Sequence, residues 1–486
     1  MPGPTSAGSL EVSILGTPAS AEAVVFDDAE LLPADPDALS AVGRRVGHDL
    51  AAPPVVLPDF HHKSKMELPS SVAVATRGTV RPDLTGSSVN CGMALIALES
   101  DVPDDRAVDR FMRSVRERYP YPTRGHRELT AAEVLRAAED GAHFGVERWD
   151  APEEDLERIE ENGRLSLEPY GSIDRLRAEL PSLAVQLARY RFGTVGPTNH
   201  FVELQRVEEI LDPERARLLG ISEGQLTLQY HGGAGVLAGE IGRLFFRRKD
   251  YPRQIKAVNA LLKPWFHLAS ARSLAELRAR LGLYFTDGCP PVELESDEGQ
   301  RLMLANAAAM NYGFAFRVST YASLRRLAAE AFGGAPGRLV VDSPHNSIYE
   351  ETVNGEPAVV HRHNACRAHP ADRMPAGSTF ARTGQAVLLP GTHRTSSYLA
   401  VAGPGSAASL HSACHGAGTV VSSLVERGLS GEHPAGHTTR RYRYDDTAPS
   451  VVPHFDDRGV NAALDVLLRN GLVSPVARMR PLAVLH

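Results

Sequence analysis

Histidines and cysteines recur in short stretches rich in glycine, proline or asparagine along this 486-residue chain. Such side chains can bind a metal or attack phosphorus. His415 is followed by Gly416, Ala417 and Gly418, so no bulky neighbour crowds its imidazole and a phosphate could approach closely. This pattern predicts His415 as a nucleophile toward a phosphate. The alternative is a small buried residue at a tight turn.

Four further residues share one local pattern, a soft ligand in a polar loop at the end of a predicted strand. They are Cys91, His200, His231 and His345. A thiolate with imidazoles suits Mn, Zn, Fe or Co better than Mg, which prefers oxygen. The spacing matches no compact zinc module, and a single histidine of this kind is more often a packed residue. Four such coincidences together predict one metal centre.

Apolar runs indicate the elements that position these side chains. Strands are expected at 12–15, 55–57, 71–75, 226–230, 338–342, 385–390 and 397–402. Asp35 and Pro36 indicate the start of a helix over 35–50, and Thr130 with Glu133 forms a capping box. Two more helices are expected at 300–317 and 321–332. Strands that end in polar loops favour a ligand site at their ends.

Composition predicts a cytoplasmic protein with no membrane association. Hydrophobic residues make up 43% of the chain, but no apolar run reaches about 18 residues and no signal peptide is evident. Four scattered cysteines favour reduced thiols over a disulfide framework. The net charge of −7 argues against wholesale coating by nucleic acid, although a local basic channel stays compatible with it.

Two segments interleave aromatic residues with cations, 245–249 and 440–444. Either could stack on bases or bind phosphates, whereas the more frequent alternative is a solvated face. The region at about 101–185 has a helical pattern and is expected to be an insertion that packs outside the core. Without repeats or clear linkers, residues 1–486 are predicted to form a single catalytic domain.

Six strings of the chain resemble, in the same order, motifs of the RtcB RNA ligases. They are GTVGPTNHF at 193–201, NYGFAFR at 311–317, HRHNACRA at 361–368, LPGTHRTSSY at 389–398, CHGAG at 414–418 and RMRPL at 478–482. The resemblance runs from about residue 58 to the C-terminal end. It implies an α/β fold, with layered β-sheets flanked by helices and a central metal-binding cleft.

The resemblance also implies a reaction. A GTP- and Mn-dependent RNA ligase of this family carries two Mn²⁺ ions and becomes guanylylated on the histidine equivalent to His415. GMP then passes to an RNA 3′-phosphate, formed where necessary from a 2′,3′-cyclic phosphate, and a 5′-hydroxyl end displaces it. Such an enzyme would act in RNA repair or tRNA splicing. RNA ends and GTP are the implied partners, and the resemblance leaves an activating protein open.

Carried over by position, the resemblance assigns roles to individual residues. The metal ligands are Cys91, His200, His231 and His345. The nucleotide-binding residues are Asn199, Glu203, His363, Thr392, Ser397, Gly416, Gly418, His486 and Phe455, the last in place of a stacking tyrosine.

Four positions depart from the family pattern. Ser88 stands where the family has a metal-bridging aspartate, so the second Mn²⁺ is expected to bind weakly. His363 and His486 replace lysines, and Thr419 replaces an arginine. These changes predict altered nucleotide choice or loss of guanylylation. Cationic residues at 61–65 and 393–394 could compensate.

Two alternatives to RNA ligation therefore stay open. The first is another reaction on phosphate ends by the same metal centre, as a phosphodiesterase or a nucleotidyltransferase. The second is a non-catalytic protein that binds RNA ends.

Overall fold

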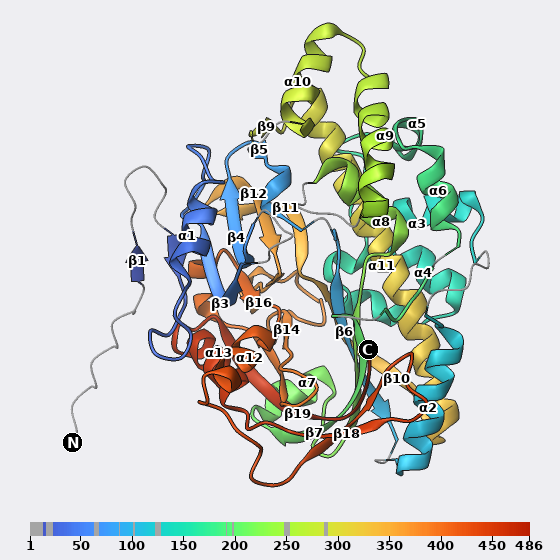
Figure 1. Ribbon diagram of the computed structural model, residues 1–486, viewed down its shortest axis with the longest axis vertical. Helices are drawn as coiled ribbons and strands as arrows, with labels where there is room; N and C mark the ends of the chain where they lie inside the picture. Colours follow the sequence, from blue (N-terminus) through green and yellow to red (C-terminus); the bar gives the residue numbers. More distant parts are fainter. Residues whose placement is uncertain are drawn as a thin grey trace.

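The computed structural model describes residues 13–15, 23–62, 68–86, 88–100, 103–121, 128–190, 192–196, 199–246, 253–285 and 290–486. Within these residues the chain is a mixed α/β protein, as predicted (Figure 1). Two large sheets carry most of the strands, and two short strand pairs complete them. The two large sheets bear the side chains of the candidate site.

The larger sheet has nine strands and is almost entirely antiparallel. Its main path runs in the order β10-β6-β8-β7-β19-β15-β14, and β17 and β18 extend it beside β19. The strands are β6 (Gly92–Glu99), β7 (Phe201–Ile210), β8 (Leu226–Gly232), β10 (Ala335–Pro344), β14 (Ala386–Leu389), β15 (Ser397–Ala402), β17 (Thr438–Tyr442), β18 (Ser450–Pro453) and β19 (Val473–Leu485). Segments far apart in sequence therefore become neighbours.

The second sheet has six strands in the order β1-β2-β3-β4-β12-β11. They are β1 (Ser13–Leu15), β2 (Ala23–Val25), β3 (Val55–His61), β4 (Ser70–Thr76), β11 (Asn346–Val353) and β12 (Glu356–His363). The short pairs are β5 (Thr79–Val80) with β9 (Val292–Glu293), and β13 (Ala365–Arg367) with β16 (Ser412–Cys414). The predicted strands at 55–57, 71–75, 226–230, 338–342 and 385–390 are present with shifted ends, and the strand at 397–402 has the predicted ends. The strand expected at 12–15 corresponds to β1.

Helix α11 (Asp297–Phe332) crosses the molecule as a single buried helix of 36 residues. The two helices expected at 300–317 and 321–332 are therefore one. Around α11 lie α2 (Asp105–Arg118), α3 (Ala131–Asp140), α4 (Ala142–Trp149), α5 (Ile173–Glu179), α6 (Ser182–Ala188) and α8 (Gly235–Phe245).

The expectation that the 101–185 region packs outside the core is wrong. Phe111, Val134 and Phe144 are buried in the same apolar cluster as Leu302 and Phe314 of α11. Amphipathic helices show which face is apolar, but their sequence does not show what covers that face. Here the central helix covers it.

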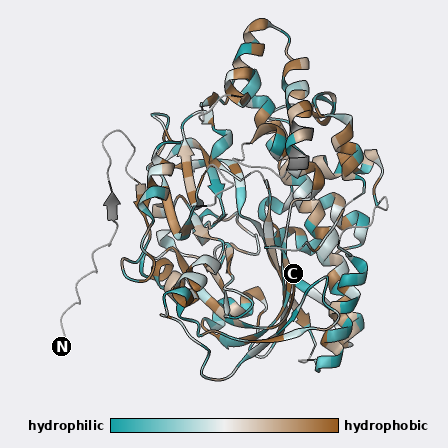
Figure 2. Cartoon of the chain, in the orientation of Figure 1, coloured by the Kyte–Doolittle hydropathy of each residue, from teal (hydrophilic) through white to brown (hydrophobic). Residues whose placement is uncertain are grey.

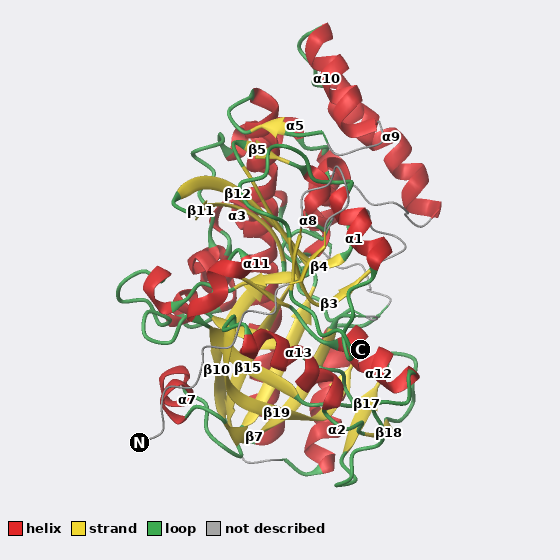
Figure 3. Cartoon of the chain, turned by 90° about the vertical axis from the view of Figure 1, so that its left-hand side faces the viewer, coloured by secondary structure: helices red, strands yellow, loops and turns green. Residues whose placement is uncertain are grey.

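The remaining helices are shorter or lie at the periphery. They are α1 (Pro36–Gly43), α7 (Pro213–Leu219), α9 (Arg253–Ala269), α10 (Leu274–Phe285), α12 (Gly418–Glu426) and α13 (Arg458–Arg469), with 3₁₀ turns at Pro82–Leu84, Glu153–Arg158, Glu160–Gly163, Ala371–Arg373 and Pro404–Ser409. Figures 1 and 3 both show α9 and α10 projecting from the rest of the molecule. Figure 2 shows hydrophobic residues along the strands and also on these two projecting helices.

Local capping signals in the sequence match the structure. The carboxylate of Asp35 accepts from the backbone N–H groups of Asp37 and Ala38 at the start of α1. Thr130 and Glu133 form both bonds of the capping box that begins α3. Across the described part of the chain, none of the helices combines the length and the apolar character needed to span a bilayer.

Candidate active site and metal cluster

Three predicted metal ligands meet at the ends of adjacent strands of the nine-stranded sheet. Cys91 directly precedes β6, His231 lies in β8, and His345 links β10 to β11. Pairing of β6 with both β8 and β10 fixes their positions. All three side chains are buried, and their ligand atoms lie within 4.8 Å of one another. One sulfur and two imidazole nitrogens form a donor set that fits a divalent transition-metal ion.

His200, the fourth predicted ligand, stands immediately before β7 at the edge of this cluster. The Sγ atom of Cys91 lies 3.5 Å from Nε2 of His200 and 3.5 Å from Nε2 of His231. Burial lowers the pKa of His200 to about 4 and holds the pKa of His231 well below its usual value. Both rings are therefore neutral near pH 7, which is the form that binds metals.

Ser88 lies one turn before Cys91, and its carbonyl oxygen accepts from the Cys91 amide at 3.0 Å. With His200 it lines a cavity of about 620 Å³, which we call the second cavity. Glu240 and Arg243 of α8 line the same cavity, and Nε of Arg243 donates to the Glu240 carboxylate at 3.1 Å. The His200 side of the cluster thus faces a space of its own.

His415 lies between β16 and α12, with its ring beside the metal cluster. The ring centroids of His415 and His345 are 4.5 Å apart, and those of His345 and His231 are 5.1 Å apart. The predicted nucleophile and the predicted ligands therefore share one site. A methyl group added at Gly418 would meet no atom within 4 Å, so the space beside this glycine is open.

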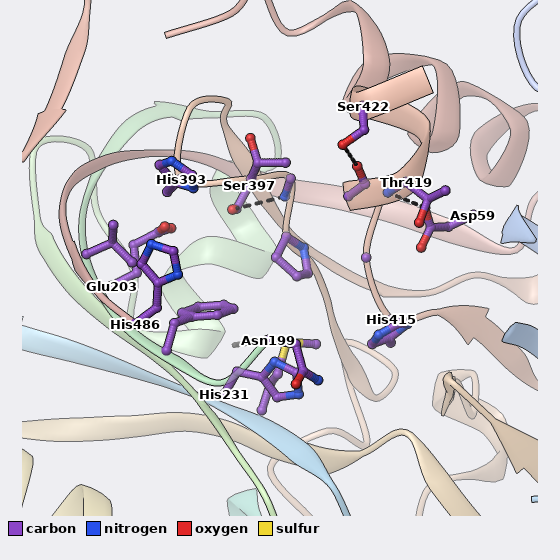
Figure 4. A pocket seen from close by; sticks show the side chains of 18 of the residues that line it. Asp59, Asn199, Glu203, His231, His393, Ser397, His415, Thr419, Ser422 and His486 are labelled. Carbon is purple, nitrogen blue, oxygen red and sulfur yellow. Dashed lines mark hydrogen bonds between the residues drawn. The ribbon is translucent and has the colours of Figure 1, made fainter. Parts of the chain in front are cut away.

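The first cavity, of about 520 Å³, opens from His231 and His415 toward the C-terminal residue. Its volume falls in the range of sites that bind small ligands. The predicted site residues that line it are Asn199, Glu203, His231, Thr392, Ser397, His415, Gly416, Gly418 and His486. Figure 4 shows that Glu203, Ser397 and His415 reach it from separate segments.

Titratable groups gather at the end of the first cavity that lies away from the metal cluster (Figure 4). Burial raises the pKa of Glu203 to about 8, although Nε2 of Gln205 donates to its carboxyl at 2.7 Å. The rings of His393 and His486 are 5.4 Å apart, and Nε of Arg441 lies 2.7 Å from Nε2 of His486. Burial, and next the charge of His486, lower the pKa of His393 to about 4. Near pH 7 both Glu203 and His393 are therefore neutral.

The loop between β14 and β15 is held in place by its own hydroxyl groups. The amide of Gly391 donates to Oγ of Ser397 at 3.3 Å, and the amide of Thr392 donates to Oγ1 of Thr395 at 2.7 Å. Oγ1 of Thr392 accepts in turn from the amide of Arg394 at 3.2 Å. Thr392 and Ser397 thus shape the cavity wall and also face its interior.

Two residues expected at the nucleotide do not line the first cavity. His363 is buried in β12, and its Nδ1 lies 2.9 Å from the carbonyl oxygen of Pro69. The ring of Phe455 is covered by the guanidinium of Arg394, 3.5 Å from the ring centroid. Their assignment to the nucleotide stays a prediction that this geometry does not favour.

Comparison with known proteins identifies the family. A family model described as "tRNA-splicing ligase RtcB" matches residues 49–486. The chain belongs to the RtcB family. It is 28% identical over 451 residues to the "tRNA-splicing ligase RtcB" of Thermococcus kodakarensis, covering 88% of this chain and 86% of that protein. It is 30% identical over 406 residues to the "RNA-splicing ligase RtcB" of Mycobacterium tuberculosis, covering 79% and 83%.

A third relative is longer than this chain. The "tRNA-splicing ligase RtcB" of Pyrococcus abyssi is 29% identical over 414 residues, which are 81% of this chain and 42% of that protein. The chain thus spans about two fifths of this Pyrococcus relative and most of the other two proteins.

One string that resembles an RtcB motif, 311–317, supports the site without lining the first cavity. Nδ2 of Asn311 donates to the carbonyl oxygen of Leu165 at 2.9 Å. Nε of Arg317 donates to the carboxylate of Asp342 at 2.7 Å, and its NH1 donates to Oδ1 of Asn90 at 2.8 Å. Because Asn90 precedes Cys91, this buried arginine fixes the loop that presents the sulfur.

One residue that lines the first cavity, Asp59, was given no role in the sequence prediction. The carboxylate of Asp59, at the end of β3, accepts from the amides of Thr419 and Val420 at 2.8 and 3.1 Å and so caps α12. Asp59 has a left-handed backbone (φ 65°) and lines the first cavity with His61. The polar run that follows the strand at 55–57 was visible in the sequence, but its contact with α12 was not.

Some predictions concern residues outside the described ranges. These are Lys63, Lys65, Pro197, Thr198, the cations at 247–249 and Cys289. In the second aromatic and cationic run, Arg440 pairs with Asp109 at 2.8 Å and with Asp105 at 3.1 Å. Arg441 contacts His486 as described above. These two arginines thus make contacts within the protein, which weakens the case for RNA binding by the run at 440–444.

Proposed function

We propose that this chain is a GTP- and metal-dependent RNA ligase that seals 3′-phosphate or 2′,3′-cyclic phosphate ends to 5′-hydroxyl ends. The observation that carries the proposal is the position of His415, 4.5 Å from the ring of His345 and in the wall of the first cavity. A nucleophile, a metal-ligand cluster and a nucleotide-sized space meet there. The names of the relatives from Thermococcus and Mycobacterium support the same reaction class.

The chemistry proposed for His415 is nucleotidyl transfer. A ring nitrogen attacks the α-phosphorus of GTP, an N–P bond forms, and the P–O bond to pyrophosphate breaks. The 3′-phosphate of RNA then takes over the GMP group, and a 5′-hydroxyl attacks that phosphate and releases GMP. A 2′,3′-cyclic phosphate must first be hydrolysed to the 3′-phosphate.

The donor set fits the ions that the proposal needs. Cys91, His231 and His345 would hold one divalent ion, and Cys91 with His200 would contribute to a second. Mn²⁺ bound there would offset the negative charge of the phosphates and of the attacking oxygen. At the far end of the first cavity, Glu203 and Ser397 would contact the nucleoside of GTP, and Asn199, which lies beside His231, would contact the nucleotide nearer the metal cluster (Figure 4).

The second cavity suggests where RNA would enter. It reaches His200, whereas the first cavity reaches His231 and His415. The nucleotide and the RNA end would then approach the metal cluster from different sides. Such an arrangement avoids competition between GTP and RNA for one pocket.

Labelled GTP tests the proposal directly. The protein is incubated with Mn²⁺ and GTP labelled on the α-phosphate, and bound label is detected after denaturing electrophoresis. We expect label on the wild type and on His143→Ala, an exposed histidine of α4, and no label on His415→Ala. Sealing of RNA with 3′-phosphate and 5′-hydroxyl ends should follow the same pattern.

A second candidate is a metal-dependent phosphodiesterase or nucleotidyltransferase of the same fold. It is favoured by Ser88 and Thr419, which replace a carboxylate and a cation of the RtcB pattern. Absence of label with every divalent metal, together with cleavage of a phosphodiester that requires Cys91, would select it. RNA binding without either reaction would select a non-catalytic RNA-end binding protein.

A further inference from the structure

Helices α9 and α10 form an arm that stands away from the sheets, as both views show (Figures 1 and 3). Residues 270–273 connect them. We refer to residues 253–285 as the arm. The arm follows α8, and α8 lines the second cavity beside His200 with Glu240 and Arg243. The arm is therefore continuous in sequence with the wall of the candidate active site.

The arm is fixed to the body by buried polar contacts. Nε2 of His267 lies 2.8 Å from the carbonyl oxygen of Leu244 in α8, and the ring of His267 stacks on Tyr284 with centroids 3.6 Å apart. Arg280 and Tyr284 both bond to the carboxylate of Glu298 in α11, at 2.8 and 2.6 Å. Both helices are thus anchored to the central helix, directly or through one another.

Above this anchor, large apolar side chains face solvent. Leu261, Trp265 and Leu274 are 76%, 71% and 75% exposed. The other tryptophan of the chain, Trp149, stacks on Phe192 with ring centroids 5.0 Å apart. A group of exposed apolar residues on a fixed element indicates a surface that binds a partner.

The charge of this region differs in sign from that of the chain. Residues 246–285 contain nine lysines and arginines and two acidic residues, a net charge of +7, whereas the whole chain has −7. Three of the five lysines in the sequence lie between 249 and 263. One of the two carboxylates, that of Glu276, pairs with Arg280 at 2.5 Å inside the arm. Lys256, Arg272 and Arg278 are exposed.

We propose that the arm binds the body of the RNA whose ends react at the metal cluster. Exposed cations that track phosphates, combined with an aromatic ring on which a base can stack, are the features of sequence-tolerant RNA binding. A second copy of the chain is a poorer occupant, because two arms, each with a net charge of +5 over residues 253–285, would repel each other. The inference rests on the proposed function for the identity of the partner as RNA.

Binding of RNA without turnover tests the arm. Fluorescence anisotropy of a labelled single-stranded RNA with a 3′-phosphate is measured without GTP or metal, over a range of salt concentrations. We expect Trp265→Ala to weaken binding by about 5- to 100-fold, the usual effect of losing one stacked base. Combined Lys256→Glu and Arg278→Glu should weaken binding at least about 10-fold and lower the salt slope by roughly 1.4, for two phosphates on a single strand.

The matched control is Arg382→Glu, an exposed arginine of the body that lies 3.8 Å from Glu214. It should bind RNA like the wild type, and all variants should keep the wild-type circular dichroism spectrum. Equal affinity of the arm variants and the wild type would overturn the inference. Loss of self-association by Trp265→Ala with unchanged RNA affinity would also overturn it, in favour of a second copy.

The two proposals fail in different ways. Labelling of His415 by GTP needs no RNA, so arm variants should be labelled like the wild type if GTP is the nucleotide. Absence of label in the wild type, with RNA binding that still depends on Trp265, counts against the ligase reaction and supports the arm. Normal labelling with RNA binding unaffected by the arm variants counts against the arm alone.

Discussion

The two ends of the first cavity are built differently. At the metal end, His231 lies in β8 and Cys91 directly precedes β6, and the pairing of these two strands places the two residues close together. At the far end, His393 belongs to a loop and His486 is the last residue of the chain. The metal end has the four residues predicted as ligands from the resemblance, whereas the far end has a histidine where the resemblance leads us to expect a lysine.

This difference indicates which part of the site can change most easily. A metal ligand on a paired strand cannot move without breaking the register of the sheet, so its position is tied to the fold. A side chain on a loop can be replaced at little cost in stability. We therefore expect metal binding to follow the family, and nucleotide choice to be the property in which this chain differs.

The largest effect should come from the support of the metal end. Arg317→Met would leave the carboxylate of Asp342 buried without its partner, which costs about 3–5 kcal/mol of unfolding free energy. Burial already raises the pKa of Asp342 to about 6 in the intact pair. Urea unfolding at pH 7 measures the loss.

A second variant separates the charge from the packing. Combined Arg317→Met and Asp342→Asn removes both charges and should recover most of the lost stability. An equal loss in the single and double variants would show that packing around Asn90, and not the buried charge, dominates.

Removal of the shared sulfur is the next largest effect. Cys91→Ala deletes the ligand that lies 3.5 Å from both His200 and His231. Metal affinity should fall at least about 100-fold. Loss of a ligand should exceed the effect of losing a group that only hydrogen-bonds to a ligand. Elemental analysis and Mn²⁺ titration measure it, and His231→Ala should behave similarly. The control is Cys366→Ala, which removes a buried thiol outside the cluster and should keep the metal. Metal retained by Cys91→Ala would contradict the comparison between the two ends of the first cavity.

The sequence predicted from a local pattern that Cys91, His231 and His345 would lie together, and the structure groups them. Their role as ligands stays a prediction. His231 and His345 each follow a recognisable apolar run, Cys91 lies in a turn-rich segment just before one, and strand ends commonly meet at ligand sites. The strand register that brings the three together was not visible in the sequence. The roles of Asn199, Glu203, Thr392 and Ser397 came only from the resemblance, and the structure adds their place on one cavity wall.

Other features depended on tertiary contacts that no local pattern encodes. Asp59 was overlooked because it caps α12, which begins 359 positions later, at Gly418. The helical pattern at 101–185 showed the apolar faces of α2 to α4. It did not show that the central helix α11 covers those faces. Phe455 was proposed to stack on a base, yet Arg394 covers its ring.

A smaller effect is expected at Ser88, on the side of the metal end that faces the second cavity. Ser88→Asp would restore a carboxylate beside His200, and carboxylates bind Mn²⁺ far better than hydroxyls. Affinity for a second ion should increase about 10-fold or more, because even a change in a group that hydrogen-bonds to a metal ligand alters affinity on this scale. Isothermal titration with Mn²⁺ measures it, with Ser88→Asn as the uncharged control. No gain would mean that the second ion uses other ligands.

The smallest effect should be found at the far end, where Glu203 is uncharged near neutrality. Its folded pKa of about 8 lies above the unfolded value of 4.5, so its contribution to stability is complete below pH 4.5 and is lost as the pH rises through 8. Glu203→Gln should remove this pH dependence, whereas the exposed Glu223→Gln should retain it. At pH 7 the Gln variant resembles the protonated carboxyl, so it should bind nucleotide within about threefold of the wild type. Above pH 8 the nucleotide affinity of the wild type should change, whereas that of Glu203→Gln should not. An ionised Glu203 at pH 7 would instead make Glu203→Gln lose affinity already there, and titration of a fluorescent guanine nucleotide at pH 7 and 9 distinguishes the two outcomes.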